Sequence, residues 1–410
     1  MSKIDQGNIG AFFFLFYVLA ETPSRKILGY VKPRYWFSFI VCSWAIIVIG
    51  MSFAAKSIFL VISTSLLGVF QSGLTPGVVN YLPNWYSRSE VGARMAILFS
   101  SCTLASVLSG PIAAGFSTFT LGNLQPYSSI FFMEGALTLV VGVIAFFAIE
   151  DSPEKCKFLT KNEIEFALER AQQTQEVSSN KHITMKNTLA VLKDWKVWAY
   201  GIMVMCINIS GTTLGFFSPV LIKALGTSSS SATLLSALPN LSGFVGQLLT
   251  SYTLTAFPLW VNSLVYATIS LIGMVAYSFT TANRVLSLFF LCIFGFGVLA
   301  NIPVIATWMS INAGGSVKRS IASVLTIIFG GIAGIVTPYV NTTHDSPSFR
   351  VSINLNIICS SVNIILTLVL VSYFYFENKN REKNPKDISD LTSDEIRNLN
   401  DYHPLFRYKL

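Results

Sequence analysis

Two carboxylates lie inside long apolar stretches of the sequence, where an ionisable side chain is costly to bury. Glu21 lies near the end of the first stretch, and Glu134 lies within the fifth. An acid at such a depth is a candidate for binding and releasing a proton. For Glu134 the alternative is a structural hydrogen bond between helices, and for Glu21 it is an ion pair with a nearby basic residue. The basic residues within reach of Glu21 are Arg25, Lys26 and Arg94.

Neutral polar side chains recur near the middle of the same stretches. Because lysine and arginine are absent from the spans, an organic anion there would need another counter-group, either a helix N-terminus, a polar side chain of this kind or an arginine on a helix outside this sequence. For each polar side chain alone, the alternative is a hydrogen bond between helices. The candidates for lining a substrate cavity are Gln71, Asn208, Asn301, Tyr17, Thr212 and Gln247.

Composition places these residues in a membrane protein. Of the 410 residues 52% are hydrophobic and only 12% are charged, which excludes an ordinary soluble globular protein. Eleven stretches are long enough to cross about 30 Å of hydrocarbon, and the backbone of each must be helical because lipid offers no hydrogen-bond partners. The predicted spans are 9–28, 35–54, 57–79, 95–119, 127–149, 197–222, 232–256, 259–280, 284–308, 320–340 and 351–376.

The net charge of +8 reports membrane topology rather than a nucleic-acid partner. Of the 28 lysines and arginines, 23 fall in alternate connections, in the segment between the fifth and sixth spans, and after the last span. Basic residues mark the cytoplasmic side of a membrane protein. The sequence therefore predicts a cytoplasmic C-terminus, an external N-terminus and membrane lipid as the surrounding partner.

Four regions follow from this pattern: an N-terminal bundle of five spans over 1–149, a cytoplasmic linker over 150–196, a C-terminal bundle of six spans over 197–376, and a cytoplasmic tail over 377–410. Within the linker, Thr160 and Glu163 have the spacing of a capping box and predict the start of a surface helix. The tail mixes charges of both signs and is expected to be poorly ordered.

Several motifs, in order along the chain, resemble those of one family. They are Glu21-Thr22-Pro23-Ser24, Leu66-Leu67-Gly68, Trp85-Tyr86-Ser87-Arg88-Ser89-Glu90, Glu150-Asp151-Ser152-Pro153, Asp194-Trp195-Lys196, Trp308, Asn312, Lys318-Arg319 and Pro404-Leu405-Phe406-Arg407-Tyr408. On these residues the chain resembles the allantoate permease family of fungal anion:cation symporters, within the major facilitator superfamily. By this alignment the missing member of a twelve-helix design is the first helix.

The resemblance implies an all-α integral membrane protein with two helical bundles. It implies a secondary active transporter in the plasma membrane that takes up a small organic anion, of vitamin, ureide, amino-acid or sulfonate type, together with protons by alternating access. It also implies a monomer without a cofactor or metal, in which Gln71, Asn208 and Asn301 lie on helices that line the central cavity. The candidates for a cytoplasmic gate are Arg88, Glu90, Arg94, Lys318 and Arg319.

The sequence departs from the family pattern at several charged positions. Thr64 and Ser65 stand where relatives carry an arginine, Gln71 stands near the place of a glutamate, and the turn 251–257 has no charge. Loss of these charges favours a second interpretation, a diverged relative that is transport-dead or acts as a sensor. An intramembrane enzyme is disfavoured because the three histidines lie outside the spans and no pair of acids or nucleophile motif is present.

Overall fold

The computed structural model describes residues 3–54, 56–81, 85, 88–116, 126–151, 156, 160, 163–164, 189, 191–314, 316–341, 349–383 and 406–410. Regular structure in these ranges is helical, without a strand. The prediction of an all-α membrane protein is therefore confirmed.

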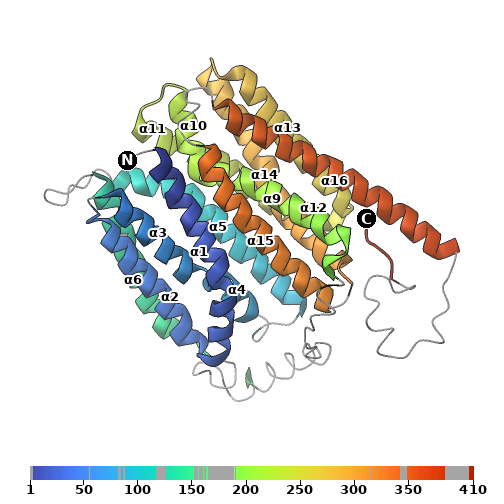
Figure 1. Cartoon of the computed structure of the whole chain (residues 1–410), viewed down its shortest axis with the longest axis horizontal. Helices are drawn as coiled ribbons and strands as arrows, with labels where there is room; N and C mark the ends of the chain where they lie inside the picture. Colours follow the sequence, from blue (N-terminus) through green and yellow to red (C-terminus); the bar gives the residue numbers. More distant parts are fainter. Residues whose placement is uncertain are drawn as a thin grey trace. The chain divides into compact units, whose positions relative to one another are not determined.

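The first half of the described chain forms a series of helices (Figure 1). They are α1 (Lys3–Tyr30), α2 (Pro33–Met51), α3 (Ser57–Gln71), α4 (Leu74–Tyr81), α5 (Arg88–Phe116) and α6 (Pro126–Ala148). Proline helps to begin α2, because Pro33 occupies its first turn, where a missing N–H costs nothing.

The second half continues with longer helices. They are α9 (Trp195–Thr212), a π-helical segment η3 (Thr213–Phe217), α10 (Ser218–Ala224), α11 (Ser229–Leu235), α12 (Ala237–Ala256), α13 (Leu259–Thr280), α14 (Arg284–Asn312), α15 (Ser316–Val340) and α16 (Arg350–Lys383). Side chains cap several of them: Asp194 accepts a hydrogen bond from the Lys196 amide at the start of α9, and Asn283 accepts one from the Leu286 amide at the start of α14.

Each of the eleven predicted spans contains helix. Eight stretches of the described chain are long and apolar enough to cross a membrane. Three shorter apolar helical stretches complete the set, namely Gly7–Glu21, Ser57–Gln71 and Ser100–Phe116.

Local differences from the predicted spans have simple causes. The predicted span 57–79 is divided into α3 and α4 around Ser72 and Gly73. The last helix does not end at residue 376 but continues to Lys383, because Arg381 and Glu377 form an ion pair one turn apart that supports the extra turns.

The helices group into two compact units. The first comprises Met1–Ser179 together with Gly334–His344, and the second comprises Asn180–Ala333 together with Asp345–Leu410. In the first unit α1 packs on α3, and α2 packs on α6. In the second unit α14 packs on α9, α12 and α13, and α16 packs on α9 and α13.

Glycine and small hydroxyls bring the helices of the second unit close together. A Cβ atom on Gly273 would lie 2.5 Å from the Phe294 nitrogen, and one on Gly297 would lie 2.5 Å from the Ser270 nitrogen. Helices α13 and α14 therefore meet backbone to backbone, as small residues allow in membranes. The Ser270 hydroxyl lies 2.9 Å from that of Ser360, which ties α13 to α16.

Candidate functional site

The two intramembrane carboxylates both belong to the first unit. Glu21 lies in α1 two residues before Pro23, and its side chain is 7% exposed. Glu134 lies in α6 and is half-buried beside Gly135, whose missing side chain lets α6 approach Ile49 of α2. Both acids thus lie where the sequence predicted them, inside apolar helices. The side chains proposed as ion-pair partners of Glu21, those of Arg25, Lys26 and Arg94, lie outside the described residues.

Tyr17 and Gln71 also belong to the first unit, on neighbouring helices. The Tyr17 ring lies 6.1 Å from that of Phe13 on the same face of α1, which packs on α3. Gln71 is the last residue of α3 and is half-buried at the break before α4. These two candidates lie on a shared helix pair, α1 and α3.

One face of α9 carries two of the predicted residues. Asn208 and Thr212 are four residues apart and therefore lie on the same side of the helix, and the Thr212 hydroxyl donates to the Asn208 carbonyl at 2.6 Å. A Cβ atom on Gly211 or Gly215 would meet no other described heavy atom within 4 Å, so this side of the helix has open space beside it.

Directly after Thr212 the helix widens into the π segment η3. Single π turns inside α-helices leave backbone carbonyls without regular partners and are frequent at functional sites. The Ile209 carbonyl just before the segment accepts from both the amide and the hydroxyl of Thr213, the hydroxyl at 2.9 Å. The sequence offered little signal for this irregularity beyond Gly211, Gly215 and Pro219.

Gln247 and Asn301 lie inside the second unit. The Gln247 side-chain amide donates to the Leu299 carbonyl at 3.3 Å, a bond from α12 to α14. This is the helix–helix hydrogen bond that the sequence left open as the alternative to solute binding. Asn301 is 2% exposed and lines a small cavity between α9, α13, α14 and α16.

Lys318 is the gate candidate whose side chain the structure describes. It is buried at the start of α15 and forms an ion pair with Asp194, the residue that caps α9. Both partners belong to the second unit. Arg88, Glu90, Arg94 and Arg319 lie in helices, but their side chains are outside the described residues.

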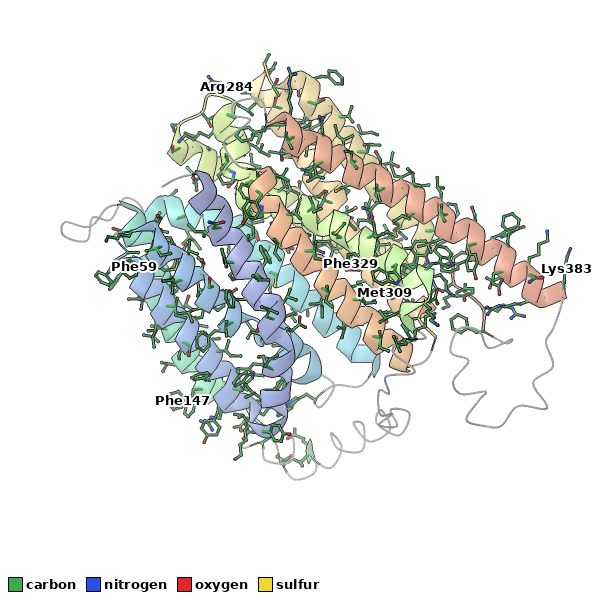
Figure 2. The ribbon with its side chains drawn as sticks, viewed as in Figure 1. Phe59, Phe147, Arg284, Met309, Phe329 and Lys383 are labelled. Atoms are coloured by element: carbon green, nitrogen blue, oxygen red, sulfur yellow. The ribbon has the colours of Figure 1, made fainter. Side chains whose placement is uncertain are left out.

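A cluster at this end of the second unit was missed as a site by the sequence analysis. We call it the tail cluster: it comprises Asp194 and Lys196, Trp308, Asn312, Lys318, Phe374, Asn378 and Arg381, with residues 406–410 docked on them. Met309 marks the α14 part of the cluster and Lys383 the end of α16 (Figure 2). The C-terminus lies beside α16 (Figure 1).

Tyr408 is the centre of the tail cluster and is 3% exposed. Its ring stacks on that of Phe374 with centroids 4.4 Å apart and an interplanar angle of 8°. Its hydroxyl accepts a hydrogen bond from the Lys196 ammonium at 2.7 Å. The Arg381 guanidinium lies 5.0 Å from the ring centroid, within the range of a cation–π interaction.

Two asparagines bind consecutive peptide units of the tail. Asn378 donates to the Tyr408 carbonyl and accepts from the Tyr408 amide, both at 2.9 Å. Asn312 does the same for Lys409, at 3.0 and 2.8 Å. The expectation that the tail is poorly ordered is therefore wrong for residues 377–383 and 406–410. The sequence carried one sign of this order: several residues quoted for the family resemblance, among them Asp194, Lys196 and Tyr408, lie in this cluster.

Comparison with known proteins finds relatives in both sequence and structure. The sequence model of the Major Facilitator Superfamily matches residues 1–338. The chain is 29% identical over 337 residues to the MFS transporter prlL of a fungal species (strain NRRL 50135), covering 82% of this chain and 68% of that protein. It is 24% identical over 405 residues to the high-affinity nicotinic acid transporter of Saccharomyces cerevisiae, covering 97% and 74%. The inward-open xylose transporter XylE from E. coli, at 12% identity, shares its fold with a TM-score of 0.70 over 98% of this chain and 91% of that one.

Proposed function

Because the chain belongs to the Major Facilitator Superfamily, whose members are transporters and not enzymes, we propose that it takes up a small organic anion together with protons by alternating access. Apart from Gly334–His344, we assign its two helical units to the two halves that move in such a cycle. We place it in the plasma membrane with a cytoplasmic C-terminus, as the charge distribution predicts, and within the allantoate permease group that its motifs resemble.

The observation that carries the proposal is the pair of acids inside apolar helices of the first unit, Glu21 and Glu134. A carboxylate that takes up a proton inside the membrane can neutralise itself when an anion enters, so the two bind and leave together. An organic anion as substrate is supported by the similarity to a nicotinic acid transporter over 97% of the chain, since nicotinate is a small carboxylate.

The substrate face we propose is that of α9, with Asn208 and Thr212 beside the open space at Gly211 and Gly215. Gln71 and Tyr17 remain candidates of the first unit, on the helix pair α1 and α3. The donor for a carboxylate would be the second N–H of the Asn208 amide, whose nitrogen also donates to the Val204 carbonyl at 2.8 Å, because the single hydroxyl hydrogen of Thr212 already binds the Asn208 carbonyl. Gln247, which bonds α12 to α14, and Asn301, which lines the internal cavity, are not part of this face.

The test is uptake by the purified full chain in proteoliposomes with an imposed proton gradient. The solutes are labelled nicotinate, allantoate, an amino acid and an alkyl sulfonate. We expect uptake of at least one of them to rise as the outside is acidified. Glu134→Gln, which keeps the shape and removes the titratable group, should abolish the dependence on the proton gradient. Glu150→Gln, just past the end of α6, is the matched control and should leave it unchanged.

A second candidate function is a transport-dead relative or sensor. It is favoured at Thr64, which stands where relatives carry an arginine: the hydroxyl is buried and donates within its own helix, lying 2.9 Å from the Leu60 carbonyl and 3.0 Å from that of Val61. This position is therefore satisfied without any solute. Saturable binding of one of the anions without gradient-driven uptake would support this candidate and contradict the first.

A further inference from the structure

A small polar cavity lies inside the second unit, apart from the proposed substrate face. It is lined by side chains from α9, α13, α14 and α16, among them Ser210, Ser270, Asn301, Ser360 and Asn363. About 10 Å³ is open to the centre of a water molecule. One buried water needs about 10–15 Å³ measured in this way, so the cavity is of the size of a single water.

Two acceptors of the cavity wall have no hydrogen-bond partner among the described residues. They are the side-chain oxygens of Asn301, which is 2% exposed, and of Asn363, which is 3% exposed. The amide nitrogen of Asn363 donates to the Cys359 carbonyl at 3.0 Å, which leaves its oxygen as the unused atom. A buried acceptor without a donor destabilises a fold, so both oxygens call for a ligand that donates.

The polar atoms that line the cavity determine which kind of ligand fits it. An anion is disfavoured because the two unpartnered atoms are acceptors and the named polar residues of the lining are neutral. A metal cation would be attracted by the oxygens, but it would be buried without a carboxylate to offset its charge, which is costly. Water has two donors for the two acceptors, and it can in turn accept from a serine hydroxyl.

We propose that this cavity is a binding site for one water molecule, which donates hydrogen bonds to the Asn301 and Asn363 side-chain oxygens and so joins α14 to α16. Both helices already pack on α13, whose Ser270 bonds to Ser360 beside the cavity. The water completes this polar layer. The site is independent of the transported solute, because its walls come from the second unit alone.

A double-mutant cycle on the full chain tests the site through thermal unfolding in detergent. With a bound water, Asn301→Leu or Asn363→Leu leaves the other acceptor with a poorly held water and lowers the Tm. The expected shift is roughly 2–4 °C each, as for a domain of 150–250 residues that loses about one hydrogen bond. The double variant removes both acceptors of the water, so its Tm should fall by less than the sum of the single shifts.

An empty cavity gives the opposite sign. Asn301→Leu would then remove an unsatisfied acceptor and raise the Tm, Asn363→Leu would also lose the bond to the Cys359 carbonyl, and the two effects would add; a raised Tm for Asn301→Leu together with additivity overturns the proposal. Where a leucine variant does not fold, the same cycle with alanine at both positions measures the coupling.

Asn356 provides the matched control for the cycle. It lies two turns earlier on α16, is equally buried, and also donates to the carbonyl four residues before it, that of Ser352 at 2.9 Å. Its side-chain oxygen also has no partner among the described residues, but Asn356 does not belong to the cavity lining. Asn356→Leu combined with Asn301→Leu should therefore be additive, and coupling as large as that of Asn363 would contradict a local site.

A comparison of salts separates water from a cation. The Tm of the wild type and of Asn363→Leu is measured in sodium chloride, potassium chloride and N-methylglucamine chloride at equal ionic strength. A water site predicts the same difference between the two proteins in all three salts. A stabilisation by sodium or potassium that the variant loses would identify a cation as the occupant and overturn the proposal.

Discussion

Two polar regions of the second unit contain similar residue types and use them differently. In the tail cluster, two asparagines have both their donor and their acceptor paired with the docked chain, and Asp194 is in ion-pair range of two lysines. In the polar cavity, two asparagines keep a buried oxygen without a partner among the described residues. The first region joins the protein to itself, and the second leaves capacity for another molecule.

This difference shows how polar side chains that stabilise the fold can be told apart from polar side chains that bind another molecule. Burial does not separate them, because Asp194, Tyr408, Asn301 and Asn363 are all nearly inaccessible. What distinguishes the two regions is whether each hydrogen-bond donor and acceptor has a partner, since a buried polar group is stable only when it is paired. Predictions for the paired region therefore concern large losses of stability.

The largest effect is expected for Asp194→Ala. The variant leaves the ammonium groups of Lys196 and Lys318 buried beside each other without their carboxylate, which costs about 3–5 kcal/mol. It also removes the cap of α9, about 1 kcal/mol more. Unfolding in detergent measures the loss.

Asp151→Ala is the matched control for this prediction. Its carboxylate lies 3.9 Å from Lys32, whose side chain is 59% exposed, and such pairs are worth about 0–1 kcal/mol. Equal losses in the two variants would show that the tail cluster is no more tightly coupled than the surface.

A somewhat smaller loss is expected for Tyr408→Ala, about 3–5 kcal/mol, because it removes a buried ring that stacks on Phe374. Tyr375→Ala provides the control, since that neighbouring tyrosine is 51% exposed. Hydrogen exchange should show the amides of Tyr408 and Lys409 losing protection only in the first variant. A stable Tyr408→Ala protein with both amides still protected would refute the docking of the tail.

Tyr408→Phe separates the hydroxyl from the ring. The ring still fills its place, but the Lys196 ammonium loses an acceptor at 2.7 Å, and a hydrogen bond to a charged group is worth about 1.5–3 kcal/mol. The expected stability lies between those of the wild type and Tyr408→Ala. Stability equal to that of the wild type would mean that Asp194 alone satisfies the ammonium.

The sequence was sufficient to predict the helical spans but not how polar groups are paired within them. Apolar length alone predicts where helices lie, because lipid leaves the backbone no other solution. Whether Gln247 bonds to a neighbouring helix or Asn301 faces a cavity depends on contacts between residues some 50 positions apart or more. Composition holds no information of that kind.

The tail is a second region whose structure could not be predicted from composition. Mixed charge predicted disorder, and seven residues after 376 remain helical while the last five are docked. What stabilises them is main-chain pairing with Asn312 and Asn378, which lie 97 and 30 residues away from their partners. The sign in the sequence was the later motifs quoted for the family resemblance, whose residues Asp194, Lys196, Trp308, Asn312, Lys318 and Tyr408 pack in this cluster.

The smallest effect is expected where polar groups are paired but not buried, at Thr160 and Glu163. The predicted capping box is confirmed on its glutamate side: the Thr160 amide and hydroxyl both donate to the Glu163 carboxylate at 2.8 Å. These bonds hold the pKa of Glu163 below its usual range, so their stabilising effect is present above the unfolded pKa of about 4.3 and is lost as the pH falls through the lowered value.

Exchange of the Thr160 amide should accelerate, relative to amides in α13, as the pH falls through that range, and Glu163→Ala should remove the pH dependence while Tm stays unchanged. Because the carboxylate is exposed, water replaces the lost partner at once; a Tm shift as large as that of Tyr408→Phe would show that pairing alone, without burial, determines stability.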